Sequence, residues 1–166
     1  MEIRGFVTNA EAYNNGRLIG EWVEFPCEEE KFSEVLNRIG VDESHDWFIS
    51  DMESELSGLK DEVESCTLEE INDIANRITS NWDNDECAIA VCEVFGVDNV
   101  LNGSEVDYMF YPATNYEELG KELVDLLCVV FPTDLEYYFN YEEYGRDCAI
   151  NMGGDFSSNG YFVERM

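Results

Sequence analysis

Apolar residues in the first third of the chain follow two different spacings. Alternation around Trp22 predicts a strand at residues 17–25, and short stretches at 2–8 and at 46–52, the latter with Trp47-Phe48-Ile49, also predict strands. Turn-forming Asn and Gly residues lie between the first two strands. Between residues 28 and 39 the apolar positions recur every three or four residues, which predicts a helix. Residues 1–60 are therefore expected to form a small α+β subdomain.

The middle of the chain, residues 61–103, has helical spacing throughout. Thr67 followed by Glu70 is a capping box, in which the two side chains satisfy free N–H groups at a helix start. Asp83 followed by Glu86 predicts the start of a second helix in the same way. This segment is expected to be a helical and acidic subdomain.

The last segment, residues 104–166, opens with an alternating pattern that predicts a strand at 106–111. Asn115 then begins an amphipathic pattern that predicts a long helix, which Pro132 stops. Residues 104–166 are therefore expected to form a second α+β subdomain.

A capping signal at Thr133 predicts a further short helix over residues 135–144, with Gly145 closing it. Residues 148–152 and 160–164 are expected to be two closing strands. The predicted fold class is α+β, in three small subdomains.

The charge of the chain is unusual for a folded protein. Among 166 residues, 38 Asp and Glu face nine Lys and Arg, a formal net charge of −29. An apolar fraction of 45% and an aromatic fraction of 13% exceed those of a disordered acidic chain, so we expect a folded protein. Repulsion on this scale weakens a compact state, which suggests that the charge has a use or that the protein works in high salt.

The acids are spread along the whole chain. Residues 1–60, 61–110 and 111–166 carry net charges of −9, −12 and −8, and acids alternate with apolar residues in each segment. An acidic tail is therefore excluded, and the charge is expected on the outside of folded elements. B-DNA carries one negative charge per roughly 1.7 Å of its helix axis. At the same charge density, 38 carboxylates would cover about 65 Å of a duplex, if the chain is elongated.

Enzyme and metal motifs are not recognisable in this sequence. His45 is the one histidine and lies in a polar stretch, where an exposed loop position is expected. The stretch Asp83-Asn84-Asp85 resembles the start of an EF-hand loop, but Ala88 and Val94 stand where that loop needs Gly and Glu. We expect no catalytic residue, no cofactor and no structural metal.

Other classes of function are disfavoured on similar grounds. Glu29-Glu30-Lys31 resembles part of a nuclease motif without its preceding Pro-Asp, and no glycine-rich phosphate loop is present. With 38 acids, some pair always has the spacing of a glycosidase pair, so that signal carries no information. Nine basic residues are too few for direct nucleic-acid binding, which depends on neutralising phosphates.

The chain is expected to be cytoplasmic, because no apolar run is long enough to span a bilayer and no secretory signal is present. Its six cysteines form no C-x-x-C pair, which disfavours zinc and redox motifs. We expect reduced thiols that serve as small core residues, with three disulfides as the alternative.

A run of aromatic residues near the C-terminus exceeds what one short helix buries. It either faces the core or forms a protein–protein contact, where Tyr and Phe are enriched. The hypothesis chosen is a homodimer contact, formed by Tyr137, Tyr138, Phe139, Tyr141 and Tyr144.

Motifs at both ends resemble the ArdA-type antirestriction proteins. The stretch from Tyr13 to Val23, Tyr-Asn-Asn-Gly-Arg-Leu-Ile-Gly-Glu-Trp-Val, with Phe25-Pro26 after it, is similar to the family's opening pattern. Ile49-Ser50-Asp51 resembles the end of its first domain, and the stretch 141–147, Tyr-Glu-Glu-Tyr-Gly-Arg-Asp, resembles its C-terminal signature. The middle third matches only in being helical and acidic.

The resemblance implies an elongated chain of three small domains that dimerises and mimics bent B-form DNA. It implies an inhibitor carried on mobile elements that competitively occupies the DNA-binding cleft of type I restriction–modification enzymes. The acids expected to bind this partner are those of the middle segment: Glu62, Glu64, Glu69, Glu70, Asp73, Asp83, Asp85 and Glu86. Two alternatives stay open, an acidic adaptor that binds a basic protein and an ordinary domain adapted to high salt.

Overall fold

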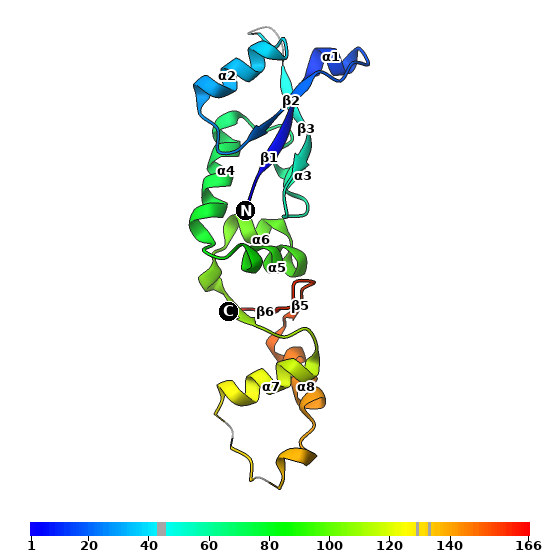
Figure 1. The fold of residues 1–166 in the computed structure, drawn as a ribbon, viewed down its shortest axis with the longest axis vertical. Helices are drawn as coiled ribbons and strands as arrows, with labels where there is room; N and C mark the ends of the chain where they lie inside the picture. Colours follow the sequence, from blue (N-terminus) through cyan, green and yellow to red (C-terminus); the bar gives the residue numbers. More distant parts are fainter. Residues whose placement is uncertain (43–45, 129, 133) are drawn as a thin grey trace. The chain divides into compact units, whose positions relative to one another are not determined.

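The structure is a computed structural model that describes residues 1–42, 46–128, 130–132 and 134–166. The chain divides into two compact units, Met1–Asp83 and Asn84–Met166 (Figure 1). Helices and short antiparallel sheets occur together, which confirms the predicted α+β class. The division into three subdomains and their elongated arrangement stay predictions.

The first unit is a three-stranded sheet with helices packed on it. Its elements are β1 (Arg4–Asn9), α1 (Ala10–Asn14), β2 (Gly20–Glu24), α2 (Glu29–Arg38), β3 (Trp47–Glu53), α3 (Leu59–Val63) and α4 (Leu68–Asn81). The strand order is β2-β1-β3, with β1 antiparallel to both neighbours. Helix α2 packs on the sheet through Phe32, whose ring contacts those of Phe25 and Trp47.

Polar side chains hold the helices of this unit in place. Asn9 ends β1, accepts the Ala12 backbone N–H to begin α1, and donates to the backbone oxygen of Ile39 at the end of α2. The Asn72 amide of α4 bonds both backbone groups of Cys27, at 2.8 Å each, and so ties α4 to the start of α2.

The second unit contains the remaining helices and a second three-stranded sheet. Its elements are α5 (Asp85–Phe95), α6 (Val97–Asn102), the 3-10 helix η1 (Glu105–Asp107), β4 (Tyr108–Tyr111), α7 (Tyr116–Leu126), the 3-10 helix η2 (Glu136–Tyr138), α8 (Tyr141–Met152), β5 (Asp155–Phe156) and β6 (Phe162–Arg165). The strand order is β4-β6-β5, and both pairings are antiparallel. Phe162 of β6 and Leu119 of α7 are fully buried in the core between this sheet and the α7–α8 pair.

The predicted helix over residues 135–144 and the predicted strand over 148–152 were wrong. The first region contains the short η2, an extended Phe139 and the first turn of α8, and the second region is the last part of α8. Asn140 begins α8 by accepting the backbone N–H of Glu143. Gly145 lies inside α8 rather than at a helix end, because it packs against the backbone of α7 at Gly120. The proposed cap Thr133 lies outside the described residues.

Boundaries of other elements also differ from those predicted, as at α5 and β4. The helix predicted to start at Asp83 is α5, and its cap is Asn84, whose side chain accepts the backbone N–H of Glu86. The strand predicted over 106–111 begins only at Tyr108, because the capping box of Ser104 and Asp107 starts the 3-10 helix η1 over Glu105–Asp107. The capping box of Thr67 and Glu70 at the start of α4 is confirmed.

Candidate functional site

Acidic side chains cover the outside of both units. Among the described residues, no Asp or Glu is buried, and the buried polar side chains are those of Thr8, Asn9 and Ser157. The first unit contains 21 acids and six bases and the second contains 17 acids and three bases, so their net charges are −15 and −14. The sequence-based expectation that the charge lies on the surface of folded elements therefore holds for the described residues.

The eight acids expected to bind the partner are divided between the two units. Glu62, Glu64, Glu69, Glu70, Asp73 and Asp83 belong to the first unit, and Asp85 and Glu86 begin α5 in the second. Seven of the eight are exposed and Glu64 is half-buried. Within each unit the structure brings together only part of the set.

Glu69 and Asp73 share a groove in the first unit with an acid that the sequence analysis left out. The groove has a volume of about 480 Å³ and is lined by Glu29, Thr67, Leu68, Glu69, Asn72 and Asp73. Glu29 is in the first turn of α2, and the tie between Asn72 and Cys27 brings that turn beside the start of α4. No sequence spacing relates residues 29 and 69, so only the fold could join them.

Several carboxylates are held in fixed positions by hydrogen bonds. The Thr67 backbone N–H and hydroxyl donate to Glu70 at 2.8 and 2.9 Å, and these bonds lower the pKa of that carboxyl. In the second unit, the hydroxyl and backbone N–H of Ser158 donate to Glu93 at 2.6 and 2.7 Å and lower its pKa. These hydrogen bonds favour the ionised form of both carboxyls and fix their orientation.

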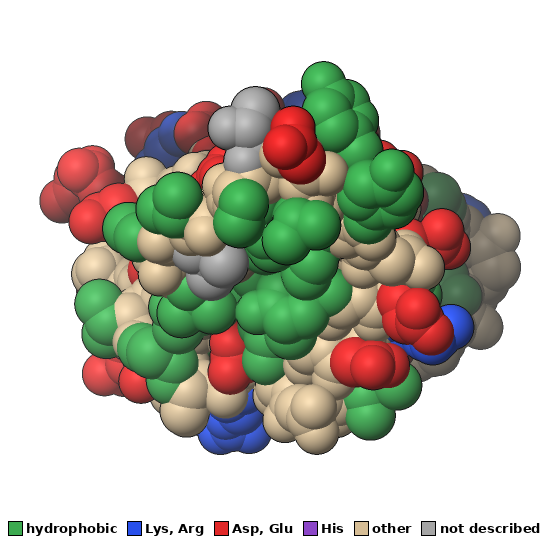
Figure 2. All heavy atoms as spheres, turned by 90° about the horizontal axis from the view of Figure 1, so that it is seen from below, with side chains coloured by type: hydrophobic (Ala, Val, Ile, Leu, Met, Phe, Trp, Pro, Cys, Tyr) green, Lys and Arg blue, Asp and Glu red, His purple; other side chains and the backbone are tan. Residues whose placement is uncertain are grey.

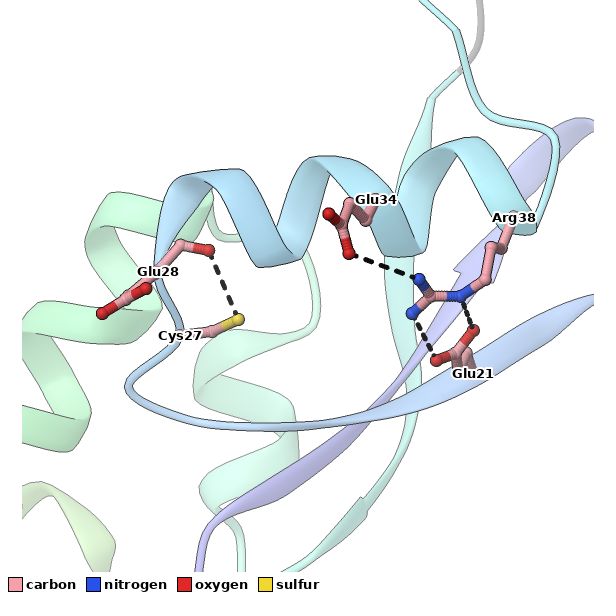
Figure 3. Close-up of polar contacts among 5 residues, drawn as sticks. All are labelled: Glu21, Cys27, Glu28, Glu34 and Arg38. Atoms are coloured by element: carbon pink, nitrogen blue, oxygen red, sulfur yellow. Dashed lines mark hydrogen bonds and ion pairs between the residues drawn. The ribbon is translucent and has the colours of Figure 1, made fainter.

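Basic residues neutralise the acidic surface only locally. Figure 3 shows the Arg38 guanidinium bonded through two nitrogens to Glu21 of β2, at 2.9 and 2.7 Å, with Glu34 3.8 Å from a third nitrogen. The bond from Arg38 lowers the pKa of Glu21. Ion pairs in the described part of the chain also engage Arg4, Lys60, Lys121 and Arg146. Because acids outnumber bases about fourfold, most carboxylates have no base to neutralise them.

The five aromatic residues expected at a dimer contact lie in two different environments. Tyr137 and Tyr138 are 91% and 84% exposed. Phe139, Tyr141 and Tyr144 are partly buried, and the ring of Phe139 contacts the other two with centroids 4.9 and 5.5 Å apart. All five were expected on one helix, but Tyr137 and Tyr138 lie in η2, Phe139 is extended between the helices, and Tyr141 and Tyr144 lie in α8.

Exposed apolar side chains gather around these two tyrosines. We define the apolar patch as Leu126, Leu127, Val130, Leu135, Tyr137 and Tyr138, all more than half exposed. Figure 2 views the structure from the end at which the α7–η2 segment lies and shows hydrophobic side chains concentrated there. Soluble monomers rarely expose such residues together, so the patch is a candidate interaction surface.

Neither a membrane segment nor a metal site is found in the described part of the chain. Within residues 1–42, 46–128, 130–132 and 134–166, no helix combines the length and apolarity needed to cross a bilayer. Over the same ranges, no group of three His, Cys, Asp or Glu side chains is arranged to hold a metal ion. The candidate loop histidine, His45, lies outside the described residues.

Comparison with known proteins identifies the family. None of the curated proteins matches the chain. The family model described as antirestriction protein (ArdA) matches residues 5–163, which includes nearly all of both units. Together with the acidic surface, this match over almost the whole length shows that the chain belongs to the ArdA family of antirestriction proteins.

Proposed function

We propose that this protein is not an enzyme but a DNA mimic that occupies the DNA-binding cleft of a type I restriction–modification enzyme. The observation that carries the proposal is the surface position of the described acids, with net charges of −15 and −14 on the two units. A cleft that binds DNA is lined with Lys and Arg, which neutralise phosphates. Carboxylates displayed on both units offer the same cleft a competing anionic surface.

The free energy of this binding comes from many weak contacts. Exposed ion pairs each contribute up to about 1 kcal/mol, so no single carboxylate decides the outcome. Carboxylates such as Glu70 and Glu93, which internal hydrogen bonds hold in place, are already ordered before binding. This order lowers the entropy lost on association and so compensates for the weaker counterion release of a protein surface.

A competition assay tests the proposal directly. The protein is titrated against a fixed DNA substrate and purified type I restriction enzyme, at several salt concentrations. We expect inhibition that increased DNA reverses and that higher salt weakens. Failure to inhibit at large molar excess would remove the proposed target, and binding without competition would favour an acidic adaptor. Unfolding of the free protein at low salt would instead favour adaptation to high salt.

Charge variants test the distributed mechanism. A single change, Glu69→Gln, is expected to leave inhibition nearly unchanged, because it removes one exposed contact among many. Neutralising the acids proposed for the interface together, Glu62, Glu64, Glu69, Glu70, Asp73, Asp83, Asp85 and Glu86, is expected to abolish it. A sharp loss from Glu69→Gln alone would contradict the mechanism. A control variant has eight acids neutralised elsewhere on the chain and therefore the same net charge. Comparing the two variants separates the effect of position from that of total charge.

We also propose that a second copy of the chain covers the apolar patch. Copies with a net charge of −29 repel each other, so association needs a surface that gains free energy from apolar burial. The patch offers six exposed apolar side chains for such burial, and next to it along the chain the rings of Phe139, Tyr141 and Tyr144 contact one another. The resulting dimer would act in the cytoplasm, where restriction enzymes meet incoming DNA.

Light scattering measures the dimer, with a matched pair of lysine variants. Tyr138→Lys places a charge in the patch and is expected to give a monomer at micromolar concentration. Val106→Lys adds the same charge at an apolar residue that is 76% exposed in η1, outside the patch, and is expected to leave the dimer intact. A monomeric wild-type protein, or equal loss in both variants, would refute this contact.

A further inference from the structure

The unit Asn84–Met166 has a pocket beside the apolar patch. It has a volume of about 330 Å³ and lies between α7, η2 and the first residue of α8. Its lining is Glu117, Lys121, Glu136, Tyr137, Phe139 and Tyr141. Three aromatic residues, two acidic residues and one lysine thus line one small volume, and an excess of acids beside aromatic rings favours a cation.

Two of the three rings are held in place by other aromatic side chains. Phe139 meets Tyr141 edge-on, with ring centroids 4.9 Å apart and an angle of 71° between the planes. The ring of Phe131 lies 4.7 Å from Phe139 and supports it from outside the pocket lining. A ligand therefore meets preformed walls at Phe139 and Tyr141.

The chain itself already places a cation against this pocket. The Lys121 ammonium lies 5.9 Å from the centre of the Tyr141 ring and 2.6 Å from a carboxylate oxygen of Glu117. The face of an aromatic ring attracts a cation in this geometry, by about 0.5–1 kcal/mol at an exposed site. Because Glu117 neutralises Lys121, the carboxylate left to a ligand is that of Glu136, which makes no ion pair among the described residues.

From this arrangement we infer that the pocket binds the guanidinium group of an arginine side chain presented by another protein. A guanidinium is planar, stacks on aromatic faces and bonds a carboxylate through two N–H groups, whereas an ammonium is more strongly hydrated. The guanidinium would stack on Tyr137 and Phe139 and bond the Glu136 carboxylate. These are the lining residues that Lys121 does not already contact. The inference rests on the proposed function, because an enzyme cleft that binds DNA presents such arginines.

Nuclear magnetic resonance of the full-length protein tests the pocket without any enzyme. The probe is N-acetyl-arginine amide, and the matched neutral compound is N-acetyl-citrulline amide, at constant ionic strength. We expect the arginine compound to give saturable shifts of the Tyr137, Phe139 and Tyr141 ring signals and of Lys121, and the citrulline compound to give none. Equal shifts with both compounds, or shifts spread evenly over exposed carboxylates, would overturn the inference.

Two neighbouring tyrosines supply matched variants. Tyr137 lines the pocket and Tyr138 does not, and both are more than four-fifths exposed, so neither substitution disturbs the core. Tyr137→Leu is expected to weaken binding of the arginine compound about two- to fivefold, the factor for one cation–π contact. Tyr138→Leu is expected to leave the affinity unchanged. Equal affinity in the two variants would remove Tyr137 from the site and refute the aromatic recognition.

Two further measurements identify where the arginine comes from. If the restriction enzyme supplies it, Tyr137→Leu weakens inhibition more than Tyr138→Leu does, although both substitutions change the apolar patch in the same way. If a second copy supplies it, N-acetyl-arginine amide lowers the dimer mass in light scattering, and the citrulline compound does not. If the wild-type protein fails to inhibit the restriction enzyme, the proposed function is refuted but the pocket is not. If the arginine compound fails to bind, the pocket is refuted but the proposed function is not.

Discussion

The close crossing of α7 and α8 leads to a quantitative prediction for Gly145→Ala. A β-carbon added at Gly145 would lie 1.9 Å from the backbone oxygen of Tyr116 and 2.7 Å from the backbone nitrogen of Gly120. Ordinary contact starts near 3.4 Å, so the two helices must separate by about 1.5 Å. Both obstructing atoms belong to the backbone, and no side-chain rotation relieves the clash.

The cost follows from two opposing effects. Overpacking a core costs about 1–3 kcal/mol, and a backbone clash lies at the upper end of that range. Replacing Gly by Ala inside a helix returns about 1 kcal/mol. We expect Gly145→Ala to lower the free energy of unfolding of the second unit by about 2 kcal/mol.

Urea denaturation of the full-length chain measures this loss. Trp22, Trp47 and Trp82 all belong to the first unit, so tryptophan fluorescence follows that unit, while the ring resonances of the eight tyrosines other than Tyr13 follow the second. Ile150→Ala is the control, because Ile150 is exposed on the same helix and its truncation should change stability by about 0.5 kcal/mol or less. If Gly145→Ala is neutral, or stabilises the protein by the full helix-propensity gain, the two helices do not cross as described.

Three further predictions concern a cap, a titration and the thiols. Thr67→Ala removes the capping box of α4 and should lower the free energy of unfolding by about 1 kcal/mol in urea denaturation. The hydrogen bonds from Ser158 hold the pKa of Glu93 below its usual value, so their stabilisation is present above the unfolded-state pKa and is lost as the pH falls through the folded one. Ser158→Ala should therefore raise the pKa of Glu93 in a carbon-13 titration, and an unchanged value would contradict the clamp. Burial raises the pKa of Cys87 to about 11, so at pH 8 a thiol reagent should modify the exposed Cys128 first and Cys87 only after unfolding; equal rates would refute this burial.

Local sequence rules determined the elements whose signals lie within a few residues. The capping box at Thr67 and the cap at Asn115 satisfy free N–H groups of their own helices, so neighbouring residues suffice to predict α4 and α7. The surface position of the acids was predictable for an equally general reason. A buried unpaired carboxylate costs several kcal/mol, so acids that alternate with apolar residues point outward.

The tertiary structure decided the features that depend on distant residues. By local rules Gly145 ends a helix, yet it lies inside α8 because only glycine allows the backbone of α7 to come so close. Glu29 joins Glu69 in one groove, and Glu136 joins Lys121 in one pocket, through contacts that no local spacing encodes. The sequence by itself determined the amount of charge, its spread along the chain and its outward orientation. Which carboxylates and rings meet was decided by packing, because these side chains come together only when distant segments bury their apolar faces against one another.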